Sequence, residues 1–180
     1  STDVQAAKDA GVPTFLIDKG IEVTGVAEAQ VLTDRFSSVP ALAQIFANNR
    51  NHRTSYIELT GASGDSRAGD AMAAFNDAMS AFPDMILAES DSQESYDFND
   101  AKARIGLMLQ NNPGAAALVC YNELQTTAGL SAIAEAGRDG TEVLCVCGDG
   151  DTIETLVSSG KVAASIVKPA NELAETVSEE

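Results

Sequence analysis

Residues 56–75, "YIELTGASGDSRAGDAMAAF", pass from a short apolar run through a loop of Gly, Ser and Asp into a stretch with helical periodicity. This order is typical of a β-strand that enters a helix through a tight turn. From Ala68 to Phe82, apolar side chains recur at i, i+3, i+4 and i+7, so one side of the helix is expected to pack on a sheet. The segment therefore predicts a strand and helix joined as one βα unit.

The same alternation of apolar runs and helical stretches continues towards the C-terminus. The predicted strands are residues 54–60, 84–90, 115–121, 141–148 and 162–168. The predicted helices cover residues 37–48, 68–82, 99–112, 122–137 and 150–159. Strands that alternate with helices are typical of βαβ units, and such units build a parallel sheet with helices on both faces. The sequence therefore predicts an α/β fold with a doubly wound parallel sheet.

The segment before residue 37 follows a different pattern. "VQAAKDAG" (4–11) indicates the end of a helix, and residues 13–18 indicate a strand. Residues 21–35 are interpreted as a connecting segment, so we expect the strand at 13–18 to lack a partner in this chain. An unpaired strand is poorly ordered or pairs with another copy. The chain is therefore expected to begin inside another domain.

The charge of the chain argues against a nucleic-acid partner. It carries 27 Asp and Glu against 11 Lys and Arg, a net charge of −16. Such a surface repels phosphate backbones and anionic lipids. No run approaches the roughly 20 apolar residues of a membrane span, and the first residues lack the features of a signal peptide. We expect no membrane insertion, and we expect any export signal to have been removed already.

The cysteines and the histidine do not suggest a metal site. Cys120, Cys145 and Cys147 lie in apolar runs without a CxxC spacing, which is typical of small buried residues. The single histidine, His52, is far away in the sequence. We therefore expect neither a metal nor another cofactor.

The loop that starts at Gly61 does not match the motifs of phosphate binding or nucleophilic catalysis. A P-loop would require Gly and Lys where Ser66 and Arg67 stand, and a nucleophile elbow would require Gly at Asp65. What remains is a turn whose free N–H groups and polar side chains can meet a neutral polar ligand. In open parallel sheets such a ligand lies at the carboxyl ends of the strands.

Six segments, in this order and spacing, resemble the periplasmic sugar-binding proteins of ABC transporters, of the ribose- and galactofuranose-binding type. They are "FLIDKG", "YIELTGASG", "DSQESYDFNDAKA", "CYNELQTTAGLSAIAEAG", "CVCGDGD" and "GKVAASIVKP". The resemblance implies two Rossmann-like lobes joined by a hinge and closing on one sugar. It places the tail of the first lobe at residues 1–33, a nearly complete second lobe at 34–168, and the return to the first lobe at 169–180. The first lobe is therefore expected to be only partly present.

The resemblance also implies the residues that bind the ligand. Asp18 matches a carboxylate that accepts sugar hydroxyls, and Lys19 stands where an arginine is usual. Phe98 matches an aromatic side chain that lies against the sugar ring. Asn122 matches an amide that both donates and accepts, and Asp149 matches a second carboxylate. From the residues alone, the polar side chains could equally be helix caps, and Phe98 could be part of the core.

Three further positions depart from the family pattern. The pocket arginine of the family falls at Gly69, and Arg67 lies two residues earlier, about 200° around a helix. Lys168 stands where glutamine is common, and Gly148 replaces an aromatic residue. Arg67 and Lys168 remain candidate ligand residues, and the pocket is expected to be more open and differently charged. These departures weaken the assignment of ribose as the ligand and favour a different or modified sugar.

The resemblance implies a non-enzymatic solute-binding protein that captures a monosaccharide and delivers it to an ABC transporter permease. Such a protein is periplasmic, or exported and lipid-anchored. One alternative is the effector domain of a cytoplasmic LacI-type repressor, which shares the fold. A second alternative is an enzyme or phospho-receiver of flavodoxin-like fold, for which Asp149 and Lys168 at adjacent strand ends are the only hint.

Overall fold

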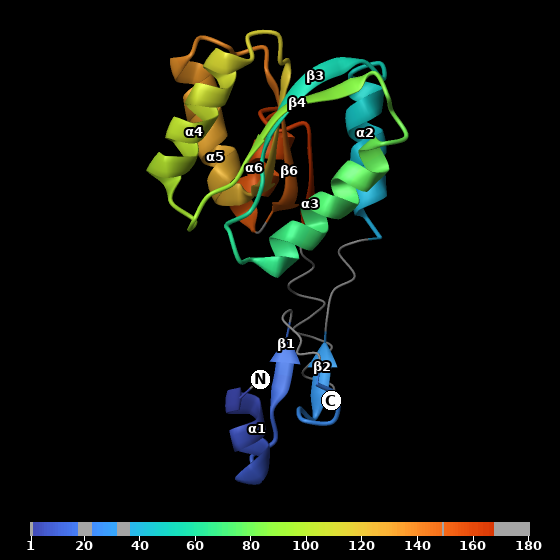
Figure 1. Cartoon of the computed structure of the whole chain (residues 1–180), viewed down its shortest axis with the longest axis vertical. Helices are drawn as coiled ribbons and strands as arrows, with labels where there is room; N and C mark the ends of the chain where they lie inside the picture. The colour runs from blue at the N-terminus through green and yellow to red at the C-terminus, as the bar shows by residue number, and fades with distance from the viewer. Residues whose placement is uncertain (1, 18–22, 32–36, 149, 168–180) are drawn as a thin grey trace. The chain divides into compact units, whose positions relative to one another are not determined.

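The computed structural model describes residues 2–17, 23–31, 37–148 and 150–167 of the chain (Figure 1). The chain divides into two compact units. The larger comprises Arg35–Val167, and the smaller comprises Ser1–Asp34 with Lys168–Glu180. The larger unit contains the elements from α2 to β7, and the smaller unit contains α1, β1 and β2.

A five-stranded sheet forms the centre of the larger unit. Its strands are β3 (Thr54–Leu59), β4 (Met85–Asp91), β5 (Ala117–Asn122), β6 (Glu142–Gly148) and β7 (Ala164–Val167). They lie in the order β4-β3-β5-β6-β7, and every neighbouring pair is parallel. The predicted parallel sheet and its α/β fold class are therefore confirmed, with strand ends within a few residues of those expected from the sequence.

Helices cover both faces of this sheet. They are α2 (Val39–Asn49), α3 (Ser66–Met79), α4 (Phe98–Asn111), α5 (Glu123–Glu135) and α6 (Asp151–Ser158). Helices α2 and α3 lie on one face, and α4 and α5 lie on the other (Figure 1). The apolar pattern predicted a helix as far as Phe82, but α3 ends at Met79. Pro83 disfavours helical backbone at the preceding residue, so Phe82 packs against the core from a turn.

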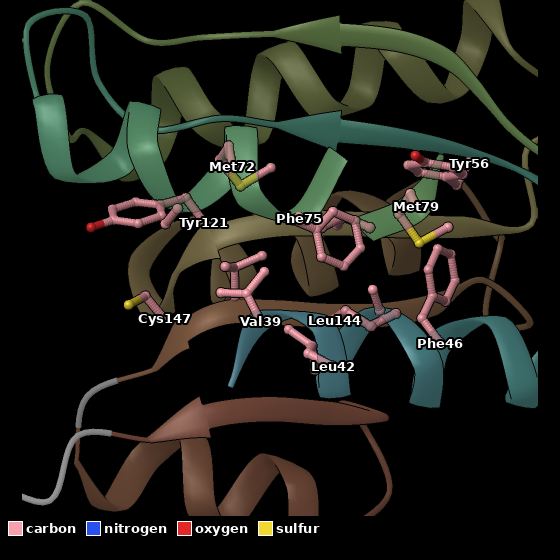
Figure 2. Close-up of a cluster of buried hydrophobic side chains, with 14 of the residues drawn as sticks. Val39, Leu42, Phe46, Tyr56, Met72, Phe75, Met79, Tyr121, Leu144 and Cys147 are labelled. Atoms are coloured by element: carbon pink, nitrogen blue, oxygen red, sulfur yellow. The ribbon is translucent and has the colours of Figure 1, made fainter. Parts of the chain in front are cut away.

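The two faces have different cores. On the α2 and α3 face, the ring of Phe46 packs edge-on against Tyr56 at 5.4 Å and is stacked with Phe75 at 6.3 Å (Figure 2). The α4 and α5 face is aliphatic, with Ile57 and Ile105 completely buried. The central strands β5 and β6 are thus covered on both faces, which explains why they are near-continuous apolar runs.

The smaller unit corrects one expectation. It contains α1 (Thr2–Asp9), β1 (Phe15–Ile17) and β2 (Ala29–Val31). The strand expected to lack a partner, β1, pairs in parallel with β2, which lies in the segment interpreted as a connection. Only three residues form β2, too few to show the alternation that identifies a strand.

Two further observations concern the described residues. Cys120, Cys145 and Cys147 are all buried and form no disulfide, so the expectation of small buried residues is confirmed. Within the ranges that the structure describes, every helix is too short or too polar to cross a bilayer.

Candidate functional site

The predicted site residues gather at the carboxyl edge of the sheet. Arg67 follows β3, Phe98 follows β4 and Asn122 ends β5, and these three strands are neighbours in the sheet. Loops after the carboxyl ends of parallel strands meet at one edge, where open α/β sheets bind ligands. The structure therefore brings these three residues to the same edge. The other predicted residues, Asp18, Lys19, Asp149 and Lys168, lie outside the described residues.

Phe98 is the first residue of α4 and is not part of either core cluster. Its side chain is 39% exposed, unlike the buried rings of the interior. The alternative of core packing is therefore wrong for Phe98. An exposed aromatic ring among polar loops is suited to cover the apolar face of a sugar ring or a similar ligand.

Asn122 ends β5 and caps α5. Its side-chain Oδ1 accepts a hydrogen bond from the backbone N–H of Gln125 at 2.9 Å. Because a backbone N–H can only donate, the oxygen of the amide must face the helix, and the NH₂ group points elsewhere. Asn122 is thus a helix cap that can still donate to a ligand, so the structural and functional interpretations are compatible.

Arg67 lies next to the cap of α3. Its Nε is 3.8 Å from Oδ1 of Asp65, the same oxygen that accepts hydrogen bonds from the backbone N–H groups of Arg67 and Ala68. These two N–H groups are therefore not free for a ligand, contrary to the expectation from the sequence. A carboxylate at this position also opposes phosphate binding at the start of α3.

Asp65 accepts a further hydrogen bond from the hydroxyl of Tyr96 at 2.7 Å. Burial opposes the charged form of Asp65, but the hydrogen bonds from Tyr96 and the backbone, together with the charge of Arg67, outweigh it. The pKa of Asp65 is therefore lowered. The ring of Tyr96 is stacked with that of Tyr121 at 6.4 Å. Sequence reasoning missed both tyrosines, although each lies within two residues of Phe98 or Asn122.

Two glycines at this edge leave no room for a side chain. A Cβ atom on Gly61 would lie 1.9 Å from Cβ of Ala68 and 2.9 Å from the hydroxyl of Tyr96. A Cβ atom on Gly148 would lie 2.6 Å from Oγ of Ser165 and 2.7 Å from Ile153. The space that a side chain at Gly148 would occupy is therefore filled by Ser165 and Ile153. Both glycines permit close approach of helix and strand.

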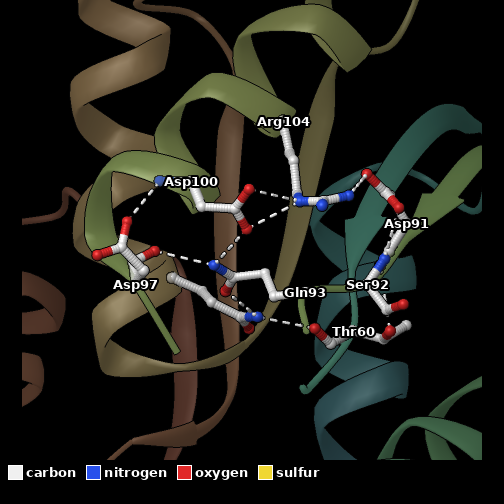
Figure 3. A network of polar contacts seen from close by, with 8 residues as sticks. Thr60, Asp91, Ser92, Gln93, Asp97, Asp100 and Arg104 are labelled. Carbon is white, nitrogen blue, oxygen red and sulfur yellow. Dashed lines mark hydrogen bonds and ion pairs between the residues drawn. The ribbon is translucent and has the colours of Figure 1, made fainter. Parts of the chain in front are cut away.

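Ion pairs and hydrogen bonds connect the loop after β4 to helix α4 (Figure 3). Arg104 donates from Nε to both oxygens of Asp100, at 3.0 and 2.8 Å, and from Nη1 to Asp91 at 2.9 Å. Asp97 caps α4 by accepting from the N–H of Asp100. Hydrogen bonds from Gln93 and then from Arg104 lower the pKa of Asp100, so it is ionised at neutral pH. The first turn of α4, which carries Phe98, is thus anchored to the end of β4.

The side chains at this edge are of kinds that can contact a neutral polar ligand. They include an amide, an exposed aromatic ring and hydroxyl groups. Among the residues that the structure describes, no group of three or more His, Cys, Asp and Glu side chains is placed to hold a metal ion.

The chain matches the family described as "Periplasmic binding protein domain" over residues 3–179, and it belongs to this family. Among curated proteins it is similar to the D-apiose import binding proteins of Actinobacillus succinogenes and Paraburkholderia graminis. Each is 27% identical, over 169 and 167 residues respectively, which is 93% of this chain in both cases. These alignments cover 54% and 53% of the two relatives, so the chain spans about half of their length.

Solved structures show the same fold. An ABC transporter periplasmic solute binding protein from Actinobacillus succinogenes with bound D-allose superimposes with a TM-score of 0.85 at 20% identity. A galactofuranose binding protein superimposes with a TM-score of 0.79 at 21% identity. The alignments cover 99% and 100% of this chain, and 65% of each solved chain. The periplasmic binding protein-like fold implied by the six sequence segments is therefore confirmed.

Proposed function

We propose that the protein is the solute-binding component of an ABC importer, that it captures a monosaccharide, and that it is not an enzyme. The observation that carries this proposal is the family match over residues 3–179. The names of the two relatives, which are import binding proteins, favour import over the repressor alternative. In this proposal the protein acts in the periplasm and its partner is the permease of the importer.

The proposed binding mode assigns a role to each candidate residue. Phe98 covers the apolar face of the sugar, and the NH₂ group of Asn122 donates to a hydroxyl oxygen. The other proposed ligand residues are Asp18, Lys19, Arg67, Asp149 and Lys168. Carboxylates accept hydrogen bonds from sugar hydroxyls, and cationic side chains donate hydrogen bonds to them. This set of residues can therefore form hydrogen bonds with a ligand rich in hydroxyl groups.

The proposed lobes follow the family pattern. Residues 34–168 form the second lobe, and residues 1–33 and 169–180 contribute to the first. Closure of two lobes around a ligand is a hinge motion of the kind known for periplasmic binding proteins. We propose that the closed form is the one recognised by the permease, because it exists in quantity only when sugar is bound.

Isothermal titration calorimetry of the full-length protein tests this proposal. The panel comprises D-apiose, D-allose, L-arabinose and D-galactose. At least one sugar is expected to bind with micromolar affinity, about −8 kcal/mol. The proposed function is wrong if none of them, and no other pentose or hexose, produces binding heat.

The Asn122→Ala variant tests the site within the same experiment. It is expected to weaken binding by about 1–3 kcal/mol, because the ligand loses a buried hydrogen-bond partner. Asn48→Ala, which removes an exposed amide from α2, is the matched control and is expected to leave the affinity unchanged. Equal affinities of the two variants would remove Asn122 from the site.

A further inference from the structure

The side chain of Gln125 contacts three separate strand ends. It lies in the first turn of α5 and is completely buried. Its Nε2 donates to the backbone oxygen of Thr60 at 2.7 Å, after β3, and to Oε1 of Gln93 at 2.9 Å, after β4. Its Oε1 accepts from the backbone N–H of Tyr121 at 3.2 Å, in β5. One amide group therefore joins the carboxyl ends of β3, β4 and β5.

Gln93 extends this connection to α4. Only 1% of its surface is exposed. Its Nε2 donates to the backbone oxygen of Asp97 at 2.8 Å and to Oδ2 of Asp100 at 3.0 Å (Figure 3). Both hydrogens of each side-chain amide are thus used, and both amide oxygens accept a hydrogen bond. The pair forms a complete network, which we name the amide bridge.

The amide bridge ends next to two residues of the candidate site. Asp97, held by Gln93, directly precedes Phe98. Tyr121, held by Gln125, directly precedes Asn122, whose Oδ1 accepts from the N–H of Gln125. The hydrogen bond between the two glutamines is therefore a link between the backbone that carries Phe98 and the backbone that carries Asn122.

We propose that Gln93 and Gln125 are positioning residues that fix Phe98 and Asn122 relative to each other for sugar binding. This proposal rests on the proposed function. Apolar contacts tolerate small displacements, whereas a buried amide that loses its partner carries the full cost of desolvation. The network therefore defines one arrangement of the loops. A binding site requires such definition, since its groups must be held to within about 0.5 Å.

The test uses Gln93→Met and Gln125→Met in the full-length protein. Methionine has a similar length and fills the same volume but cannot form the hydrogen bonds. Each variant is expected to bind sugar about 10-fold more weakly, which corresponds to about 1.4 kcal/mol. Gln110→Met, on the exposed side of α4, is the control for the substitution itself and is expected to bind normally.

A second control separates positioning from general loss of stability. Ile133→Ala truncates a buried side chain near the other end of α5 and is expected to destabilise the fold. It is nevertheless expected to bind sugar within about twofold of the unmodified protein, because the site itself is intact. If Gln125→Met binds as tightly as Ile133→Ala, the proposal is overturned.

Hydrogen exchange supplies a measurement that does not depend on the sugar. The N–H of Asp100 is bonded to the cap of α4, on the far side of the amide bridge from Gln125. Gln125→Met is expected to accelerate exchange at Asp100 in the ligand-free protein, whereas Gln110→Met is not. Unchanged exchange at Asp100 would show that the loops are held independently and would overturn the proposal. If the unmodified protein bound no sugar, the proposed function would fail, and the exchange result alone would decide on the amide bridge.

Discussion

Two buried polar clusters in the larger unit differ in how completely they are hydrogen-bonded. In the amide bridge, every side-chain N–H of Gln93 and Gln125 has an acceptor. In the second cluster, Oε1 of Glu58 accepts from Asn76 at 3.2 Å and from Ser90 at 2.7 Å. Among the described residues, however, Oε2 of Glu58 and Oδ1 of Asn76 are buried without a partner.

The difference follows from the chemistry of the side chains. An amide carries donors and an acceptor, so two amides and nearby backbone groups can complete each other. A carboxylate can only accept hydrogen bonds, and only 2% of the surface of Glu58 is exposed. Burial therefore raises the pKa of Glu58 despite the hydrogen bonds from Ser90 and Asn76. Burial, followed by the charge of Glu58, raises the pKa of the adjacent Tyr56 to about 12. We therefore expect the internal cluster to lower the stability of the fold at neutral pH, in contrast to the amide bridge.

The largest expected effect comes from removing Gln125 from the amide bridge. Gln125→Ala deletes three hydrogen bonds and leaves buried partners unpaired, so it is expected to lower the free energy of unfolding by about 3 kcal/mol. Urea denaturation measures this change. Gln110→Ala, at an exposed position of α4, is expected to change it by less than about 0.5 kcal/mol. A loss below about 1 kcal/mol for Gln125→Ala would remove the contrast between the two clusters.

The opposite sign is expected for the second cluster. Glu58→Gln replaces the carboxylate by a neutral amide, whose NH₂ group can donate to Oδ1 of Asn76. We expect it to raise the free energy of unfolding at pH 7 by about 1 kcal/mol, the usual size of one hydrogen bond. Thermal and urea unfolding measure the gain. A destabilised variant would show that the charge of Glu58 is better accommodated than its contacts indicate.

The pH dependence of the stability gained by Glu58→Gln shows whether the gain comes from removing a buried charge. In the unfolded chain the carboxyl group of a glutamate has a pKa of about 4.3. When folding raises this pKa, the folded protein keeps the proton at pH values where the unfolded chain has already lost it. The contribution of this carboxyl group to stability therefore decreases as the pH rises from about 4.3 through the raised pKa of Glu58. Glu58→Gln removes this decrease, so its gain is expected to be larger at pH 7 than at pH 4. A gain independent of pH would exclude buried charge as the cause.

The smallest expected effect concerns the polar pair nearer to solvent. Tyr96→Phe removes the hydrogen bond to Asp65, and we expect a loss of about 0.5 kcal/mol at pH 7. Because this bond helps to lower the pKa of Asp65, the variant should show a higher pKa for that carboxyl group, measured by NMR titration. The stability contributed by a lowered pKa is lost as the pH falls. The difference between the two proteins should therefore diminish towards acid pH, and a constant difference would contradict this explanation.

The fold was predictable wherever a segment was long enough to show its period. Strands such as β5, "ALVCYN", are buried on both faces and appear as continuous apolar runs. The strand β2 consists of Ala29, Gln30 and Val31, which carry no such signal. Its pairing with β1 depends on tertiary contacts that no local pattern contains.

The site was predictable only in part. Phe98 and Asn122 were proposed as ligand residues because the segments that contain them resemble motifs of the family. Gln93 and Gln125 were missed because glutamine is usually exposed, and the two residues are separated by 32 positions in the sequence. The exposed fractions of Gln93 and Gln125, 1% and 0%, follow only from the arrangement of β3, β4 and β5 side by side in the sheet.

The close packing around Gly148 limits the substitutions that this position can accept. Any larger residue at this position would collide with Ser165 and with two carbon atoms of Ile153. An aromatic residue, which the family resemblance implies before the second carboxylate, therefore requires Ser165 and Ile153 to move or a smaller residue at position 153. We therefore expect the effects of substitutions at positions 148 and 153 to depend on each other. A library that varies both positions together should yield folded aromatic variants, whereas a library restricted to Gly148 should yield none.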